Sequence, residues 1–121
     1  MAERPSYREL NNKLSAAKDF IAKSQWAPAE PVKLAPDFRR FDLYTEEEQS
    51  SALLAALEEI EPGRYIGRQP PEKAYDKRVY GLDLFAFCWP WRKFGCTMYM
   101  KFCVTKDALY VVSFHESRER D

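Results

Sequence analysis

TMYMKFCVTKDALYVVSFHES, residues 97–117, carries the strongest structural signal in this chain of 121 residues. Apolar side chains alternate with other side chains on both sides of the polar segment TKDA. This pattern is typical of two antiparallel strands joined by a tight turn. It predicts strands over residues 97–104 and 109–116. His115, the only histidine of the chain, lies near the end of the second run.

Two registers are open to this hairpin, and they differ in the length of the loop. A two-residue loop pairs Val104 with Leu109 and puts Phe114 on the face that carries Tyr99. A three-residue loop pairs Thr105 with Leu109 instead. A shift of one residue moves every side chain of a strand to the opposite face, so the burial of one face selects between the two registers.

The three-residue loop gathers the apolar side chains on one face, and it is the register that we predict. Its other face then carries a phenol, an ammonium group and an imidazole close together. The facing pairs that follow are Met100 with Phe114, Phe102 with Val112, Tyr99 with His115, and Lys101 with Ser113.

The rest of the chain supplies two helices and one more strand. Apolar residues at helical spacing predict helices over residues 6–25 and 45–61, and the second opens with a capping box. Residues 27–41 contain three prolines and are expected to form an extended connection. Residues 79–89 are apolar on both alternating faces, which predicts a central strand.

These elements predict an α+β fold with a single domain over residues 1–121. Two N-terminal helices are expected to pack on a C-terminal, three-stranded antiparallel sheet. The sheet side chains expected to face the helices are Met98, Met100, Phe102, Val112 and Phe114.

The composition excludes several classes of protein. Hydrophobic residues make up 45% and aromatic residues 15%, which excludes a wholly disordered chain. No apolar run approaches the roughly 20 residues that span a bilayer, and no signal peptide is expected. Cys88, Cys96 and Cys103 lack metal-binding spacing, which indicates reduced thiols rather than a zinc site. We therefore expect a cytoplasmic protein that uses no metal or cofactor.

The net charge of zero combines two unequal halves. Residues 1–61 hold 8 Lys and Arg against 12 Asp and Glu, a balance of −4, and residues 62–121 hold 11 against 7, a balance of +4. A basic C-terminal half is compatible with a partner that carries phosphates. Ordinary variation of surface charge explains the same numbers.

Tyr99, Lys101 and His115 are the candidate catalytic residues. Facing residues on neighbouring strands have Cβ atoms roughly 5 Å apart, so these three would share one sheet face. Such a set can cleave RNA without a metal: a base takes the proton of the 2′-hydroxyl, a cation stabilises the phosphorane, and an acid protonates the leaving 5′-oxygen. Histidine can serve in either proton transfer. The same residues also suit a solvated, half-exposed sheet without catalysis.

Aromatic and basic residues are interleaved in CWPWRKFG, residues 88–95. Trp91, Arg92 and Lys93 are candidates for RNA binding, because aromatic rings stack on bases and cations bind phosphates. For Trp89, packing in the core is the stronger expectation. Further candidates for phosphate contacts are Lys77 and Arg78, although a solvated loop is the stronger expectation for them.

The segments MYMKFCV and LYVVSFHES resemble the C-terminal strands of MqsR-type toxins, which are RelE-like mRNA interferases of bacterial type II toxin–antitoxin systems. The segment RPSYRELNNKLSAAKDFIA is similar to their basic first helix. By position, Tyr99, Lys101 and His115 correspond to catalytic residues of that family, with His115 where a lysine is often found. The resemblance implies a RelE-like fold and a sequence-selective, metal-independent endoribonuclease. It also implies mRNA as substrate and a protein antitoxin as partner, and it leaves open whether the ribosome is a further partner.

Two other functions stay open at this point. The first is a non-catalytic protein-binding module of related fold that docks through the Trp89–Gly95 loop, since Trp and Arg are favoured at interfaces. The second is a nucleic-acid-binding protein without catalysis, which the zero net charge makes weaker. A neighbouring gene for a small DNA-binding protein would favour the toxin.

Overall fold

The fold is α+β and is built on a four-stranded mixed sheet, as seen in a computed structural model. The structure describes residues 5–67, 71–75 and 77–117. Within these residues the strand order is β1-β4-β3-β2. The elements are α1 (Tyr7–Ala22), β1 (Trp26–Pro28), α2 (Pro31–Arg40), α3 (Glu46–Glu59), the 3₁₀ turns η1 (Pro62–Arg64) and η2 (Lys77–Val79), β2 (Phe85–Trp91), β3 (Cys96–Val104) and β4 (Leu109–Glu116).

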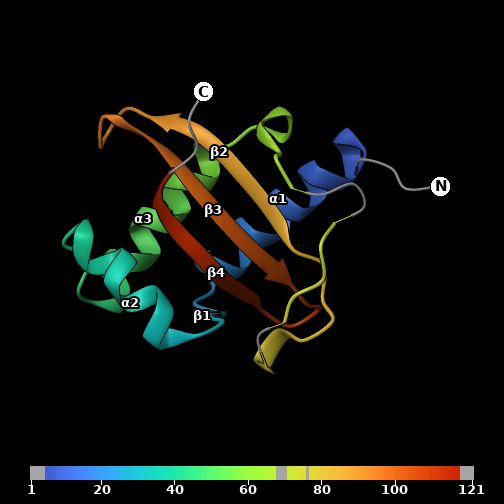
Figure 1. The fold of residues 1–121 in the computed structure, drawn as a ribbon, viewed down its shortest axis with the longest axis horizontal. Coiled ribbons are helices and arrows are strands. Elements are labelled where there is room, and N and C mark those ends of the chain that lie inside the picture. Colours follow the sequence, from blue (N-terminus) through green and yellow to red (C-terminus); the bar gives the residue numbers. More distant parts are fainter. Residues whose placement is uncertain (1–4, 68–70, 76, 118–121) are drawn as a thin grey trace.

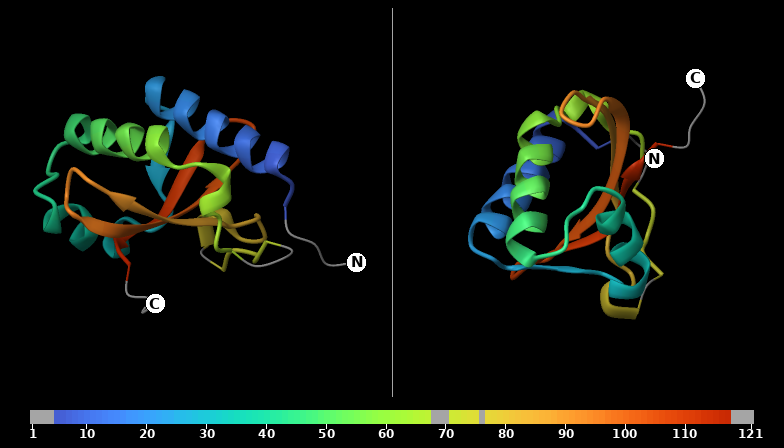
Figure 2. Two further views of the ribbon diagram at one scale, coloured as in Figure 1. Left: turned by 90° about the horizontal axis from the view of Figure 1, so that it is seen from above. Right: turned by 90° about the vertical axis from the view of Figure 1, so that its left-hand side faces the viewer.

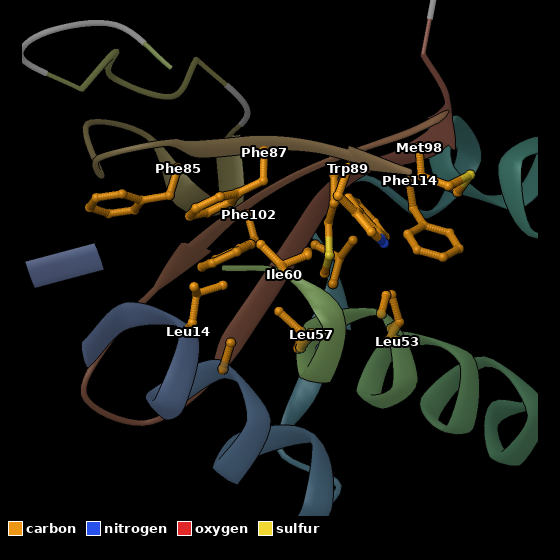
Figure 3. Close-up of a cluster of buried hydrophobic side chains, with 14 of the residues drawn as sticks. Leu14, Leu53, Leu57, Ile60, Phe85, Phe87, Trp89, Met98, Phe102 and Phe114 are labelled. Atoms are coloured by element: carbon orange, nitrogen blue, oxygen red, sulfur yellow. The ribbon is translucent and has the colours of Figure 1, made fainter. Parts of the chain in front are cut away.

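Helices α1 and α3 lie side by side on one face of the sheet and bury its apolar side chains (Figures 1 and 2). We call the apolar layer between these two helices and the sheet the main core. Leucines of both helices point at an aromatic row from β2 (Figure 3). Phe87 of that row stacks on Phe102 of β3, with ring centroids 5.9 Å apart. The two predicted helices are confirmed, and with them the prediction that Trp89 packs in the core.

The β3–β4 hairpin contains both of the registers that the sequence allows. Next to the turn, Val104 faces Leu109 and Phe102 faces Val111, as a two-residue loop requires. Beyond a bulge, Lys101 faces Ser113, so Val112 is the extra residue of β4.

The predicted pairs Met100–Phe114, Tyr99–His115 and Lys101–Ser113 are therefore confirmed. The predicted pairs Phe102–Val112 and Thr105–Leu109 are wrong. Thr105 instead closes the turn, because its Oγ1 accepts the backbone N–H of Ala108 at 2.9 Å.

Residues 27–41 were predicted to be extended, and this prediction is wrong for most of them. They hold the short strand β1 and the helix α2. Pro31 is the first residue of α2, where a helix needs no N–H donor. Leu34 and Phe38, one turn apart, are buried in the main core. This packing outweighs the hydrogen bond that Pro36 removes from the exposed side of the helix.

The edge of β4 is closed by two different elements. Strand β1 runs parallel to it and covers Leu109 to Val111. Further along, α2 takes over, and the carboxylate of Asp37 accepts the backbone N–H of Phe114 at 3.4 Å. The prediction of a three-stranded antiparallel sheet is therefore wrong. The strand β1 pairs in parallel with the free side of β4, so the sheet is mixed and has four strands.

Strand β2 lies at the other edge of the sheet, so its predicted central place is wrong. It is also shorter than the predicted residues 79–89, since residues 77–79 form η2. On its second face Ala86 is buried, Cys88 is half-buried and Pro90 is exposed. Its edge is partly paired, because Ile66 donates its backbone N–H to the carbonyl of Ala86 at 2.9 Å.

The bulge predicts unequal costs for truncating two adjacent valines. Val111 is fully buried in the main core, whereas Val112 is half-buried on the opposite face. At roughly 0.8 kcal/mol per buried methylene plus a cavity term, Val111→Ala should lower the free energy of unfolding by about 2 kcal/mol. Val112→Ala should cost less than half of that. Urea unfolding measures both, and the reverse order would show that β4 has no bulge at Val112.

The capping box of α3 predicts a stability term that depends on pH. Glu48 accepts the backbone N–H groups of Tyr44 and Thr45 at 2.9 and 3.0 Å, and these bonds lower the pKa of its carboxyl. The stabilisation is therefore complete above the ordinary value of 4.5 and is lost as the pH falls through the lowered folded-state value. Glu48→Ala should lower the melting temperature at pH 7, and the difference from the wild type should vanish in acid.

Glu47→Ala is the matched control for Glu48→Ala, because Glu47 lies in the same first turn of α3. It should have the smaller effect at pH 7, since only Glu48 completes the capping box. Equal effects of the two substitutions would contradict the assignment of the cap.

Candidate functional site

The face of the sheet opposite α1 and α3, which we call the outer face, is only partly covered. Residues 72–75 and 77–84 lie across the end of it where β3 finishes (Figure 1). There Ala74 and Leu84 are buried against Cys103 of β3. The outer face is open nearer the other end of β3, where the predicted catalytic side chains lie.

Tyr99 and His115 are in direct ring contact on the open part of the outer face. Their ring centroids are 5.1 Å apart and the ring planes differ by 23°, which is a stacked arrangement. Nδ1 of His115 lies 2.8 Å from the carbonyl oxygen of Glu116. Because a carbonyl can only accept, Nδ1 carries a proton, and the second nitrogen, Nε2, is left for proton exchange.

Lys101 lies on the same face, two residues along β3 from Tyr99. Among the residues that the structure describes, no carboxylate lies within salt-bridge distance of its ammonium group. The charge of Lys101 is therefore available to an anion that enters the site. The structure thus brings the predicted trio together on one face.

A hollow of about 420 Å³ opens over this part of the sheet, with residues of α2 on one side and Glu72, Tyr75 and Leu84 on the other. We call it the outer-face hollow. Its size is within the roughly 300–1,000 Å³ of small-ligand sites. The residues that line it are Lys33, Asp37, Glu72, Tyr75, Leu84, Lys101, Val112, Ser113 and His115, and Tyr99 joins Lys101 in an adjoining hollow that shares Glu72.

Sequence reasoning missed the two walls of the hollow. Lys33 and Asp37 come from α2, which was predicted to be extended, and Glu72 and Tyr75 come from a segment without periodic signal. Only the one-turn spacing of Leu34 and Phe38 indicated a helix there. No local pattern indicated that residues 72–75 and 77–84 would fold back over the sheet.

Arg40 and Glu116 lie at the end of the outer face beyond His115. Their ion pair, 3.2 Å long, joins α2 to β4. A further hollow next to it is lined by Cys88, Cys96, Thr97 and Ser117. Burial and the nearby Glu116 carboxylate raise the pKa of the Cys96 thiol, and Arg40 opposes this rise.

The five residues predicted to bind RNA do not form one surface. Arg92 and Lys93 are exposed in the turn between β2 and β3, while Lys77 and Arg78 are exposed in η2 near the other end of β3 (Figure 1). Trp91 is 1% exposed and packs edge-on against Phe114 at 5.8 Å. A buried ring cannot stack on a base, so the prediction is wrong for Trp91.

No family model, curated protein or solved structure matches the chain. Within the described residues, no group of His, Cys, Asp and Glu is large enough to hold a metal ion. None of the helices in that part of the chain has the length and apolar content to cross a membrane. The resemblance to MqsR-type toxins stays a prediction, and the site is interpreted from its own geometry.

The charges of Glu116 and Arg40 act on the Cys96 thiol in opposite directions. Substitutions of these two residues are therefore expected to change the rate of Cys96 alkylation in opposite directions. Glu116→Gln removes a negative charge, so it should lower the Cys96 pKa and speed alkylation by iodoacetamide near neutral pH. Arg40→Met removes the opposing positive charge and should slow it.

Peptide mass spectrometry follows each cysteine separately in this experiment. Buried Cys103 serves as the internal control, because its alkylation reports on opening of the fold. Both substitutions moving the Cys96 rate in the same direction would argue against this electrostatic arrangement.

Proposed function

We propose that the outer-face hollow is the active site of a metal-independent, sequence-selective endoribonuclease. The observation that carries this proposal is the placement of His115, stacked on Tyr99, beside a lysine without a carboxylate partner among the described residues. An imidazole for proton transfer and a cation for phosphate are two of the three groups that RNA cleavage without a metal uses, the third being a second group for proton transfer.

The reaction assigns a role to each group. The 2′-oxygen forms a bond to phosphorus while the bond from phosphorus to the 5′-oxygen breaks, which yields a 2′,3′-cyclic phosphate and a 5′-hydroxyl. The 2′-hydroxyl loses its proton to a base, and the 5′-oxygen takes one from an acid. His115 supplies one of these transfers through Nε2, and Tyr99 and Glu72 are the nearby groups able to supply the other. Lys101 stabilises the negative charge on the phosphorane.

The cellular part of the proposal follows the resemblance to the toxins. We infer mRNA as the substrate, inside or outside the ribosome, and a protein antitoxin as the inhibitor.

The docking alternative is weaker, because it relied on tryptophans as anchors and both Trp89 and Trp91 are buried. Binding of nucleic acid without cleavage is separated from catalysis by the experiment that follows.

Removal of His115 should abolish activity without unfolding the protein. Loss of a proton-transfer group typically costs 10²–10⁴-fold in rate, whereas a half-buried ring at the end of a strand contributes little to packing. The measurement is cleavage of labelled RNA in EDTA by the wild type and His115→Ala, with thermal melting as the control for folding. The products should carry 2′,3′-cyclic phosphate ends.

Lys101→Ala and Lys106→Ala form a matched pair for the same assay. Lys106 is an exposed lysine in the turn between β3 and β4, outside the hollow. Lys101→Ala should reduce cleavage strongly and Lys106→Ala should leave it unchanged.

If the wild type and His115→Ala cleave RNA equally, His115 is not catalytic. RNA binding by the wild type without any cleavage would favour the binding protein.

A further inference from the structure

We propose that Tyr75 is a stacking platform for a base of single-stranded RNA at the rim of the outer-face hollow. This inference deepens the proposed function by naming the form of the substrate, and it rests on that function. It comes from an aromatic ring that the fold holds in water next to the candidate catalytic groups.

The Tyr75 ring is 81% exposed although it lines the hollow. Among the described residues it has no hydrogen-bond partner and no aromatic neighbour. Tyr65, by contrast, is buried and contacts two phenylalanine rings of β2. Other tyrosines of this chain are also exposed, and what distinguishes Tyr75 is that it lines the hollow, where its ring is open to a ligand that enters there.

The backbone beside Tyr75 is held in place. Ala74 is buried and donates its N–H to the carbonyl of Leu82 at 2.8 Å, while its own carbonyl accepts the N–H of Gly81 at 3.0 Å. Lys73 forms an ion pair with Asp83 across the same segment. The ring is thus presented from a braced loop, and little backbone order is lost when a ligand binds.

The charges around the hollow favour stacking over electrostatic attraction. Lys33 and Lys101 are balanced by Asp37 and Glu72, and Lys33 is also paired with Glu30 at 2.9 Å. A polyanion therefore gains little from net charge at this place. A flat aromatic ring near one available ammonium group fits a nucleotide, whose base stacks while its phosphate meets Lys101.

This arrangement selects for single strands. In a duplex, each base already stacks on its neighbours and pairs across the helix, so its faces are not open to a side chain. An unpaired base can turn outward onto Tyr75 while its phosphate remains over the sheet. Stacking reads no hydrogen-bond pattern, so Tyr75 contributes affinity that depends little on the base.

The experiment measures binding separately from cleavage. The probe is a short labelled RNA whose 2′-hydroxyls are all replaced by 2′-methoxy groups, which cannot attack the phosphate. Fluorescence anisotropy gives the Kd of the full chain for this probe, alone and annealed to its complement. Loss of a base-stacking aromatic typically weakens binding roughly 5- to 150-fold, so Tyr75→Ala should raise the Kd for the single strand by that factor.

Tyr80→Ala is the matched control, because Tyr80 is 73% exposed in the same segment but does not line the hollow. It should bind like the wild type, as should Tyr75→Phe, which keeps the ring. The duplex should bind more weakly than the single strand. Equal binding by Tyr75→Ala and the wild type, equal binding of duplex and single strand, or no binding by the wild type would each overturn the inference.

Failure of the proposed function is distinguishable from failure of this inference. If the wild type binds the probe through Tyr75 but does not cleave natural RNA, the endoribonuclease is wrong and the stacking platform stands. If the wild type cleaves RNA and Tyr75→Ala cleaves it with the same KM, the platform is wrong and the enzyme stands.

Discussion

Burial of one face of the β3–β4 hairpin is the constraint on which the rest of the structure depends. Leu109, Val111 and Phe114 all face α1 and α3, yet they are spaced by two and then by three residues. A regular strand cannot bury all three on one side, because its side chains alternate. The bulge at Val112 resolves this conflict. It also turns His115 to the outer face, opposite Tyr99, so the geometry of the candidate site follows from packing on the other side of the sheet.

Helix α2 serves both the stability of the sheet and the shape of the site. Strand β1 is too short to cover β4, and unpaired strand edges invite association with other chains. Asp37 and the buried Leu34 and Phe38 complete that edge with a helix. Because a helix is thicker than a strand, α2 rises above the outer face and forms one wall of the hollow. On the other side, Ala74 and Leu84 are buried against Cys103, and Glu72, Tyr75 and Leu84 line the other wall.

The outer-face hollow combines balanced charges with several groups able to transfer protons or to stack. Such a site suits a substrate recognised by the shape and the flat faces of its bases more than by its net charge. This agrees with the zero net charge of the whole chain, which offers no strong field to a polyanion.

The sequence by itself determined the two long helices, the capping box and the antiparallel hairpin, because each rests on a local period or on a cap within a few residues. It also predicted that Tyr99 faces His115, since only one register gathers the apolar residues of this part of the hairpin on one face.

The exact pairing near the turn required tertiary structure, because only the packing of Val111 against the helices selects the bulge. The same is true of α2, whose prolines obscure a helix that Leu34 and Phe38 stabilise through contacts distant in sequence. The burial of Trp91 in the core and the walls of the hollow were likewise decided by long-range packing, for which no local pattern exists.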